Sequence, residues 1–232
     1  MTGKLYGVGV GPGDPELMTL KAARIIRECD VIAVPDTGDK EMTALGIAQK
    51  ALPELCGKRT VSLTLPMSRN EELLREYHTR AAKQLMRLLI DGLTVAFLTL
   101  GDPTVYSTYM YIHKIVLEMD GQAEIVPGVP SFCAAAARLG VSLAERGEAL
   151  HILPGSYGGA AEGLNLAGTK VLMKTGKSFD KIKAELAGRG MLHKAKMVQR
   201  CGMEGERVFR DLALADADAS YFSIIIIKDA EK

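Results

Sequence analysis

The sequence contains no tryptophan, and aromatic residues make up only 5% of its 232 residues. Proteins that bind single-stranded nucleic acid stack bases on aromatic rings, so no such surface is expected here. The formal net charge of +1 lacks the basic excess typical of nucleic-acid-binding proteins. No apolar run reaches the roughly 18 residues of a membrane helix, and residues 1–5 lack the apolar core of a secretory signal. The composition predicts a globular protein of the cytoplasm.

Cysteine is also scarce, and its spacing is uninformative. The four cysteines, Cys29, Cys56, Cys133 and Cys201, show no C-x-x-C pair. They are expected to be reduced thiols in or near the core. The four histidines are equally scattered, so the sequence predicts no metal site.

Strand-like and helix-like segments alternate in the first part of the chain. Apolar runs predict strands at 4–10, 31–34, 61–65, 93–98 and 123–126. Helical spacing lies between them, at 16–29, 42–52, 70–90, 111–116 and, after the last strand, 133–139. Such alternation predicts an α/β fold with a mostly parallel sheet.

The pattern changes around residues 140–147, where we place a boundary between an N-terminal α/β domain, 1–143, and a C-terminal α/β domain, 144–232. The second part has little helix apart from 179–187. Its strands are predicted at 150–153, 169–174, 196–200, 207–211 and 221–227. This arrangement predicts a smaller mixed sheet.

A Gly-Asp-Pro turn, Gly101 to Pro103, follows the most apolar predicted strand and precedes a helix. Ligands of open α/β sheets bind at such turns, at the carboxyl ends of the strands. An ordinary strand–helix connection would have the same appearance. Asp102 could attract a cationic ligand or cap the turn, and the sequence leaves both roles open.

A second glycine-rich turn follows the first predicted strand, with Gly9, Gly11 and Gly13 at alternate positions. A dinucleotide-binding G-x-G-x-x-G turn would need glycine at position 14. Asp14 stands there and would repel a pyrophosphate. A dinucleotide-dependent oxidoreductase is therefore disfavoured, although the loop still favours close approach of a ligand to its backbone.

Four loops together resemble the tetrapyrrole methylases, a family of S-adenosylmethionine-dependent enzymes. They contain Gly11-Pro12-Gly13-Asp14, Gly101-Asp102-Pro103, Pro127-Gly128-Val129-Pro130-Ser131-Phe132 and Thr175-Gly176. The resemblance covers essentially the whole chain. It implies two α/β domains, a mostly parallel N-terminal sheet and a mixed C-terminal sheet with the active-site cleft between them, and a homodimer.

Residues 101–111, Gly-Asp-Pro-Thr-Val-Tyr-Ser-Thr-Tyr-Met-Tyr, resemble the branch that methylates carbon 20 of precorrin-2 or cobalt-factor II in cobalamin biosynthesis. The resemblance implies that S-adenosyl-L-methionine is the cofactor, a tetrapyrrole the substrate, and S-adenosyl-L-homocysteine the product. A methylase of another tetrapyrrole position and a non-catalytic tetrapyrrole-binding protein remain alternatives. Neither a catalytic base nor the metal content of the substrate follows from the sequence.

Carried over residue by residue, the resemblance implies a set of cofactor contacts. They are Pro12, Leu100, Gly101, Asp102, Val105, Tyr106, Ser107, Thr108, Pro130, Ser131, Phe132, Lys174, Thr175, Cys201 and Gly202. The tyrosines near position 106 could instead pack within a first helical turn. Lys174 and Arg200 could pair with substrate carboxylates or lie on the surface.

Overall fold

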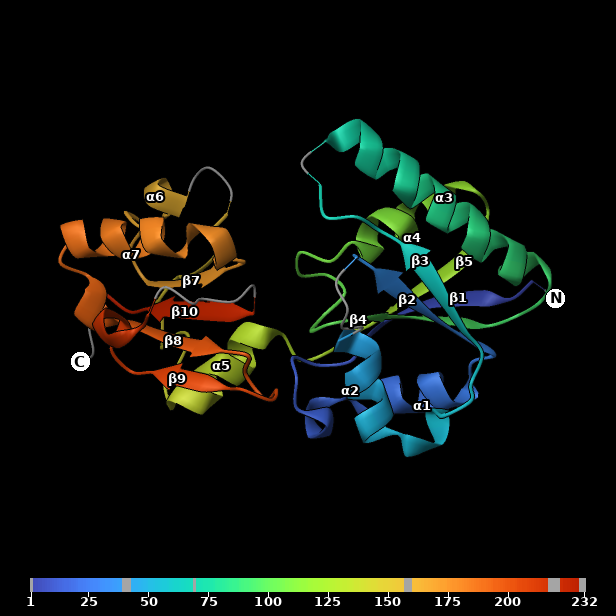
Figure 1. The fold of residues 1–232 in the computed structure, drawn as a ribbon, viewed down its shortest axis with the longest axis horizontal. Helices are drawn as coiled ribbons and strands as arrows, with labels where there is room; N and C mark the ends of the chain where they lie inside the picture. Colours follow the sequence, from blue (N-terminus) through green and yellow to red (C-terminus); the bar gives the residue numbers. More distant parts are fainter. Residues whose placement is uncertain (1, 39–42, 69, 157–159, 217–221, 230–232) are drawn as a thin grey trace. The chain divides into compact units, whose positions relative to one another are not determined.

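The computed structural model describes residues 2–38, 43–68, 70–156, 160–216 and 222–229. It divides into two compact units, Met1–Pro130 and Ser131–Lys232. Each unit contains one five-stranded sheet (Figure 1).

The sheet of the first unit is parallel throughout, which confirms the predicted fold class. Its strand order is β3-β2-β4-β1-β5. The strands are β1 (Lys4–Gly9), β2 (Val31–Asp36), β3 (Thr60–Thr64), β4 (Val95–Thr99) and β5 (Gln122–Val126). All residues of β4 are buried, as expected for a strand covered on both faces.

Helices cover both faces of this sheet, α1 and α2 on one side and α3 and α4 on the other (Figure 1). They are α1 (Leu20–Glu28), α2 (Thr43–Ala51), α3 (Glu71–Ile90) and α4 (Tyr109–Glu118), with short 3-10 turns η1 (Pro15–Leu17) and η2 (Pro53–Leu55). The neighbouring strands β1 and β4 are therefore followed by helices on opposite faces. That is the topological switch point at which open α/β sheets bind ligands.

The segment after β1 differs from the continuous helix that the pattern predicted over 16–29. Asp14 caps η1, since its Oδ1 accepts a hydrogen bond from the Glu16 amide at 2.9 Å, as predicted. The chain then leaves helical geometry, and Thr19 caps α1 by accepting from the Ala22 amide at 3.1 Å. Two separate N-caps each begin their own helical segment, η1 and α1, which apolar spacing alone does not reveal.

The sheet of the second unit is mixed, as predicted. Its order is β6-β7-β10-β8-β9, with β6 and β7 parallel and the other pairs antiparallel. The strands are β6 (Leu150–Pro154), β7 (Thr169–Met173), β8 (Ala195–Gln199), β9 (Arg207–Phe209) and β10 (Ser223–Ile227). The helical segments are α5 (Ser131–Leu139), α6 (Ala160–Gly163) and α7 (Phe179–Gly188), with the 3-10 turns η3 (Gly176–Ser178), η4 (Leu192–Lys194) and η5 (Leu212–Leu214).

The compact units divide earlier than the boundary that the sequence pattern predicted. Helix α5 packs against β8 and β10, so it belongs to the second unit. Whether 1–143 and 144–232 are separate folding domains stays a prediction. Met42 and Tyr221, included in predicted elements, lie outside the described residues.

The structure corrects part of the cysteine expectation. Cys29 is buried, but Cys56 and Cys133 are exposed, so a position in or near the core is wrong for these two. Within the described ranges, no helix combines the length and the apolar character needed to cross a membrane.

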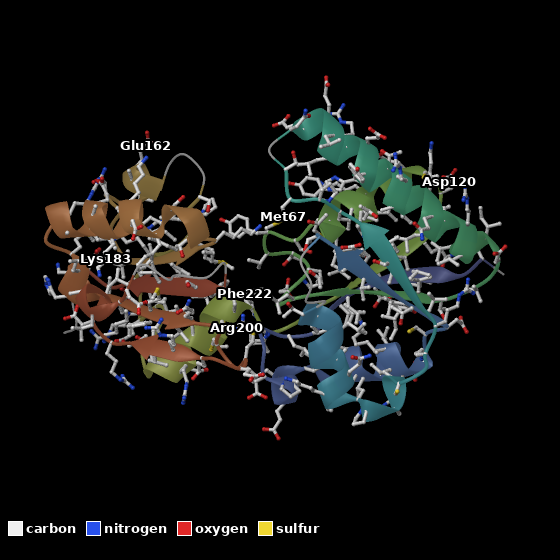
Figure 2. The ribbon with its side chains drawn as sticks, in the orientation of Figure 1. Met67, Asp120, Glu162, Lys183, Arg200 and Phe222 are labelled. Atoms are coloured by element: carbon white, nitrogen blue, oxygen red, sulfur yellow. The ribbon has the colours of Figure 1, made fainter. Side chains whose placement is uncertain are left out.

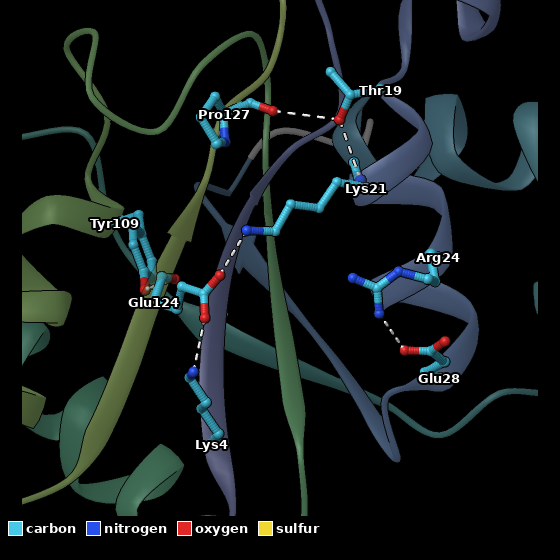
Figure 3. A network of polar contacts seen from close by, with 9 residues as sticks. Lys4, Thr19, Lys21, Arg24, Glu28, Tyr109, Glu124 and Pro127 are labelled. Carbon is cyan, nitrogen blue, oxygen red and sulfur yellow. Dashed lines mark hydrogen bonds and ion pairs between the residues drawn. The ribbon is translucent and has the colours of Figure 1, made fainter.

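A charged network joins β5, β1 and α1 in the first unit (Figure 3). The Glu124 carboxylate accepts from Lys4 and from Lys21, each at 2.7 Å. The hydrogen bond from Lys21, followed by that from Lys4, lowers the pKa of Glu124 to about 2. A carboxyl whose pKa is lowered by folding stabilises the native state above its unfolded pKa, and this stabilisation is lost as the pH falls toward 2.

We expect Glu124→Gln to lower the free energy of unfolding at pH 7 by less than about 1 kcal/mol, because the three side chains are one third or more exposed. The difference from wild type should shrink as the pH falls from about 5 to 2, where the wild-type carboxylate is protonated. Urea unfolding of both proteins across this pH range measures the difference in the free energy of unfolding.

Glu28→Gln is the matched control, because among the described residues Glu28 pairs only with Arg24, and its side chain is 60% exposed. Its effect on the free energy of unfolding at pH 7 should be smaller than that of Glu124→Gln. If the difference in the free energy of unfolding between wild type and Glu124→Gln stayed constant between pH 5 and 2, protonation of Glu124 would not be linked to stability as proposed.

Candidate functional site

Three strand-end loops of the first unit meet backbone to backbone at glycines. Gly11 and Gly101 form an antiparallel bridge, in which the Gly101 amide donates to the Gly11 carbonyl at 2.8 Å. A Cβ on Gly9 would lie 2.5 Å from the Gly101 oxygen and 2.7 Å from the Gly128 nitrogen. A Cβ on Gly128 would lie 2.2 Å from the same Gly101 oxygen. Glycine is therefore required where the loops after β1, β4 and β5 converge.

Asp102 fastens two of these loops together. Its Oδ2 accepts from the Gly128 amide at 2.9 Å, and its Oδ1 accepts from the amide of Thr104 at 2.8 Å and from the Thr104 hydroxyl. The side chain is only 8% exposed. Both oxygens are thus bound to protein donors, which favours the turn-capping role over a direct ionic role toward a ligand.

The segment after Asp102 is fixed at its other end by Ser107. The Ser107 hydroxyl bonds the Thr99 hydroxyl at 2.9 Å and accepts from the Tyr109 amide at 3.2 Å. Thr108 precedes α4 without a side-chain cap. Residues 102 to 107 consequently form a loop braced at both ends.

Tyr109 belongs to the core and not to a ligand site. Its side chain is fully buried, and its hydroxyl donates to the Glu124 carbonyl at 3.1 Å and contacts His113 Nδ1 at 3.0 Å. A Cβ on Gly7 would collide with the Tyr109 ring at 2.0 Å. Burial raises the pKa of the Tyr109 phenol well above its usual range. The packed alternative therefore holds for this tyrosine.

Tyr106 differs from Tyr109 in its exposure and in its backbone conformation. Its ring is 42% exposed, and its backbone has φ of 49°, in the left-handed region. Lys174 and Arg200, which follow β7 and β8, share this conformation, with φ of 54° and 52°. Such strained residues concentrate at functional sites.

The other expected contacts of the first unit also lie in these loops. Pro12 is buried beside the Gly11–Gly101 bridge, whereas Leu100, Val105 and Pro130 are partly exposed. The parallel sheet brings all of them to one edge, at the carboxyl ends of β4, β1 and β5.

In the second unit, β6, β7 and β8 run in the same direction, because β7 and β8 are both antiparallel to β10. Lys174 and Thr175 therefore leave the same sheet edge as Cys201 and Gly202. Ser131 and Phe132 begin α5, with Phe132 buried.

Thr175 is the residue of this edge most suited to hold a ligand. It is fully buried, and its hydroxyl has no hydrogen-bond partner within the described part of the chain. A buried hydroxyl without a partner is costly, and a ligand that bonds it removes that cost. Burial also lowers the pKa of the neighbouring Lys174, which makes its ammonium less favourable than on the surface.

Gly202 lies in a turn held by Glu206. The Gly202 amide donates to Glu206 Oε2 at 2.8 Å, and Arg138 Nε donates to Glu206 Oε1 at 2.5 Å. The bond from Gly202, followed by that from Arg138, lowers the pKa of Glu206. Because its amide is engaged, Gly202 would contact a ligand through its carbonyl or Cα.

Arg200 is anchored at the same turn. Its amide donates to the Phe222 carbonyl at 2.9 Å, and its Nε donates to the Glu204 carbonyl at 2.8 Å. The guanidinium lies 5.9 Å from the centroid of the Phe222 ring (Figure 2).

The expected cofactor contacts did not include Gly9, Gly128 or Thr104, although the loops that contain them were noted in the sequence. The alternating glycines and the Asp-x-Thr spacing were signals for local turns. The long-range bond between Asp102 and Gly128 has no local signal. Among the residues that the structure describes, no group of three or more His, Cys, Asp or Glu side chains could hold a metal ion.

A family model described as Tetrapyrrole (Corrin/Porphyrin) Methylases matches residues 4–215. The match spans both units, from β1 to the segment after η5.

Several curated proteins are similar over nearly the whole chain. The cobalt-precorrin-2 C(20)-methyltransferase of Salmonella typhimurium is 34% identical, over 98% of this chain and 97% of its own. The precorrin-2 C(20)-methyltransferase of a Sinorhizobium species is 31% identical, over 97% and 95%. The cobalamin biosynthesis protein CobIJ of Mycobacterium tuberculosis is 34% identical over 97% of this chain. The chain spans only 46%, about half, of the length of that protein.

Solved structures show the same fold. A cobalt precorrin-4 methyltransferase, CbiF, superposes with a TM-score of 0.73 at 20% identity, covering 97% of this chain and 94% of that one. The uroporphyrin-III C-methyl transferase of Thermus thermophilus, solved with S-adenyl homocysteine, gives a TM-score of 0.67 at 24% identity, covering 98% of each chain.

We expect Asp102→Ala to lower the free energy of unfolding by about 1–3 kcal/mol, because it leaves the Gly128 and Thr104 amides without their acceptor. Urea denaturation of the purified variant measures this change.

Asp14→Ala is the control in the neighbouring loop. Asp14 is more exposed and caps a single amide, so its loss should cost about 0.5–1 kcal/mol. Equal losses in the free energy of unfolding for the two variants would show that Asp102 does not stabilise the contact between the loops.

Proposed function

Because the chain belongs to the tetrapyrrole (corrin/porphyrin) methylases, we propose that it transfers a methyl group from S-adenosyl-L-methionine to carbon 20 of precorrin-2 or cobalt-factor II. The observation that carries the proposal is its similarity, over nearly its whole length, to two proteins named as C(20)-methyltransferases. The CobIJ protein is about twice as long, so its activity as a whole is not carried over.

The described residues fit a bound nucleoside-type methyl donor on two counts. The glycine convergence at Gly9, Gly101 and Gly128 leaves backbone without side chains at the switch point, where a ligand can approach closely. The buried Thr175 hydroxyl offers a hydrogen bond that no described residue uses. Apart from Tyr106, whose ring is partly exposed, the cofactor set of the sequence from Pro12 to Gly202 remains our proposal for the residues that hold the methyl donor.

When bound, S-adenosylmethionine supplies a methyl group activated by its positively charged sulfur. Carbon 20 of the electron-rich ring supplies the electron pair of the new carbon–carbon bond. The sulfur keeps the electrons of the broken bond, and the carbon 20 proton leaves to solvent or to a base.

The contribution of the chain is to hold the two reactants in line and to exclude water. The braced loop from Asp102 to Ser107 is rigid enough for this task, since hydrogen bonds fix both ends. Lys174 and Arg200 are our candidates for the carboxylate arms of the tetrapyrrole. Assembly as a homodimer and a cytoplasmic location also remain predictions.

Calorimetry with S-adenosylhomocysteine tests the cofactor, and we expect an affinity in the micromolar range. Methyl transfer is then measured with metal-free precorrin-2 and with its cobalt form, using a carbon-13-labelled methyl donor. We expect a product one methyl heavier, with the label on carbon 20 by NMR.

Uroporphyrinogen III is the control substrate and should remain unmethylated. A label at another carbon would indicate a methylase of a different position. Binding of cofactor and tetrapyrrole without transfer would indicate a non-catalytic binding protein, and no heat with S-adenosylhomocysteine would contradict the proposal altogether.

A further inference from the structure

Tyr106 has an unfavourable backbone conformation at a position that is fixed on both sides. Its φ of 49° lies in the left-handed region, which costs tyrosine more than it costs glycine or asparagine. The loop cannot relax easily, because Asp102 bonds Gly128 on one side and Ser107 bonds Thr99 on the other. The chain thus maintains a strained tyrosine in a rigid loop.

The ring of Tyr106 is also partly exposed to solvent. It is 42% exposed, whereas the ring of Tyr109, three residues later, is fully buried. Burial of the hydroxyl end still raises the pKa of Tyr106, so the phenol stays neutral at physiological pH. A neutral, partly exposed aromatic ring suits contact with a large, flat, mostly apolar ligand.

A second large apolar side chain, Met67, is exposed at the same edge of the sheet. It follows β3 at the carboxyl end, is 63% exposed, and projects beyond the strand ends in Figure 2. Strands β3 and β4 are separated by β2 alone, which places their ends roughly 10 Å apart. Exposed apolar groups on two loops of the ligand-binding edge indicate a surface that a broad ligand covers.

We propose that Tyr106 is a specificity-determining residue whose ring packs against the face of the tetrapyrrole, and not a contact of the methyl donor. This inference rests on the proposed function. It reassigns Tyr106 from the cofactor set that the resemblance implied, because strain and exposure favour a broad, flat partner.

The test substitutes Tyr106 by glycine and by asparagine, both of which tolerate the left-handed conformation. The urea midpoint should equal or exceed that of wild type, since the strain is relieved. The KM for the tetrapyrrole, at saturating S-adenosylmethionine, should rise about tenfold with the loss of the ring contact. The Kd for S-adenosylhomocysteine should change less than about twofold by calorimetry.

Two further variants complete the design. Tyr106→Phe keeps the ring, so its KM should stay near that of wild type. Arg146→Gly is the matched control, because Arg146 is exposed and has φ of 50°, yet lies far along the chain from the loop. It should relieve the same strain and leave the KM unchanged.

A readout without turnover is the binding of precorrin-2 to protein saturated with S-adenosylhomocysteine. The glycine and asparagine variants of Tyr106 should weaken this binding equally.

Failure of this inference is distinct from failure of the proposed function. If wild type binds S-adenosylhomocysteine and methylates carbon 20, but the Tyr106 variants keep the wild-type KM, the assignment of Tyr106 is wrong. It is also wrong if the cofactor Kd rises as much as the KM. A wild-type protein that transfers no methyl group overturns the function first, and the inference with it.

Discussion

The contact among the backbones of Gly9, Gly101 and Gly128 is the constraint on which the rest of the first unit depends. Three segments that are far apart in sequence meet without a Cβ between them, and a Cβ on Gly9 or on Gly128 would lie less than 3 Å from the backbone of its neighbours. Asp102 then joins two of the loops through the Gly128 amide. The parallel sheet makes this possible, because it aligns the carboxyl ends of β4, β1 and β5 at one edge.

The same constraint separates structural from ligand-facing roles along a single segment. Asp102 is bound by its own turn and by Gly128, and Tyr109 is bound within the core. Tyr106 lies between them, exposed and strained. We therefore propose the ligand-facing role for the Tyr106 ring, and a structural role for the acidic residue of the Gly-Asp-Pro turn. In the second unit, the buried Thr175 hydroxyl is the feature that a ligand would satisfy.

Much of the fold could be predicted from the sequence because its signals are local. Alternating apolar runs and helical spacing predicted the parallel and the mixed sheet, and Asp14 before Pro15 predicted the first cap. What could not be predicted depends on distant partners. The break at Thr19, the bond from Gly128 to Asp102 and the packing of α5 on β8 and β10 all arise from contacts that the local pattern does not contain. The left-handed backbone of Tyr106 likewise has no local signal in the sequence, and it lies between two long-range or loop-closing hydrogen bonds.

The central claim is that the glycine convergence and its Asp102 clamp form the fixed part of a methyl-donor site. A crystal structure of the protein with S-adenosylhomocysteine tests it most directly. We expect ligand density against the backbone of Leu100 to Val105, with the Asp102 carboxylate still bonded to Thr104 and Gly128. Density at another edge of the sheet, or an Asp102 side chain released from Gly128 to contact the ligand, would contradict it.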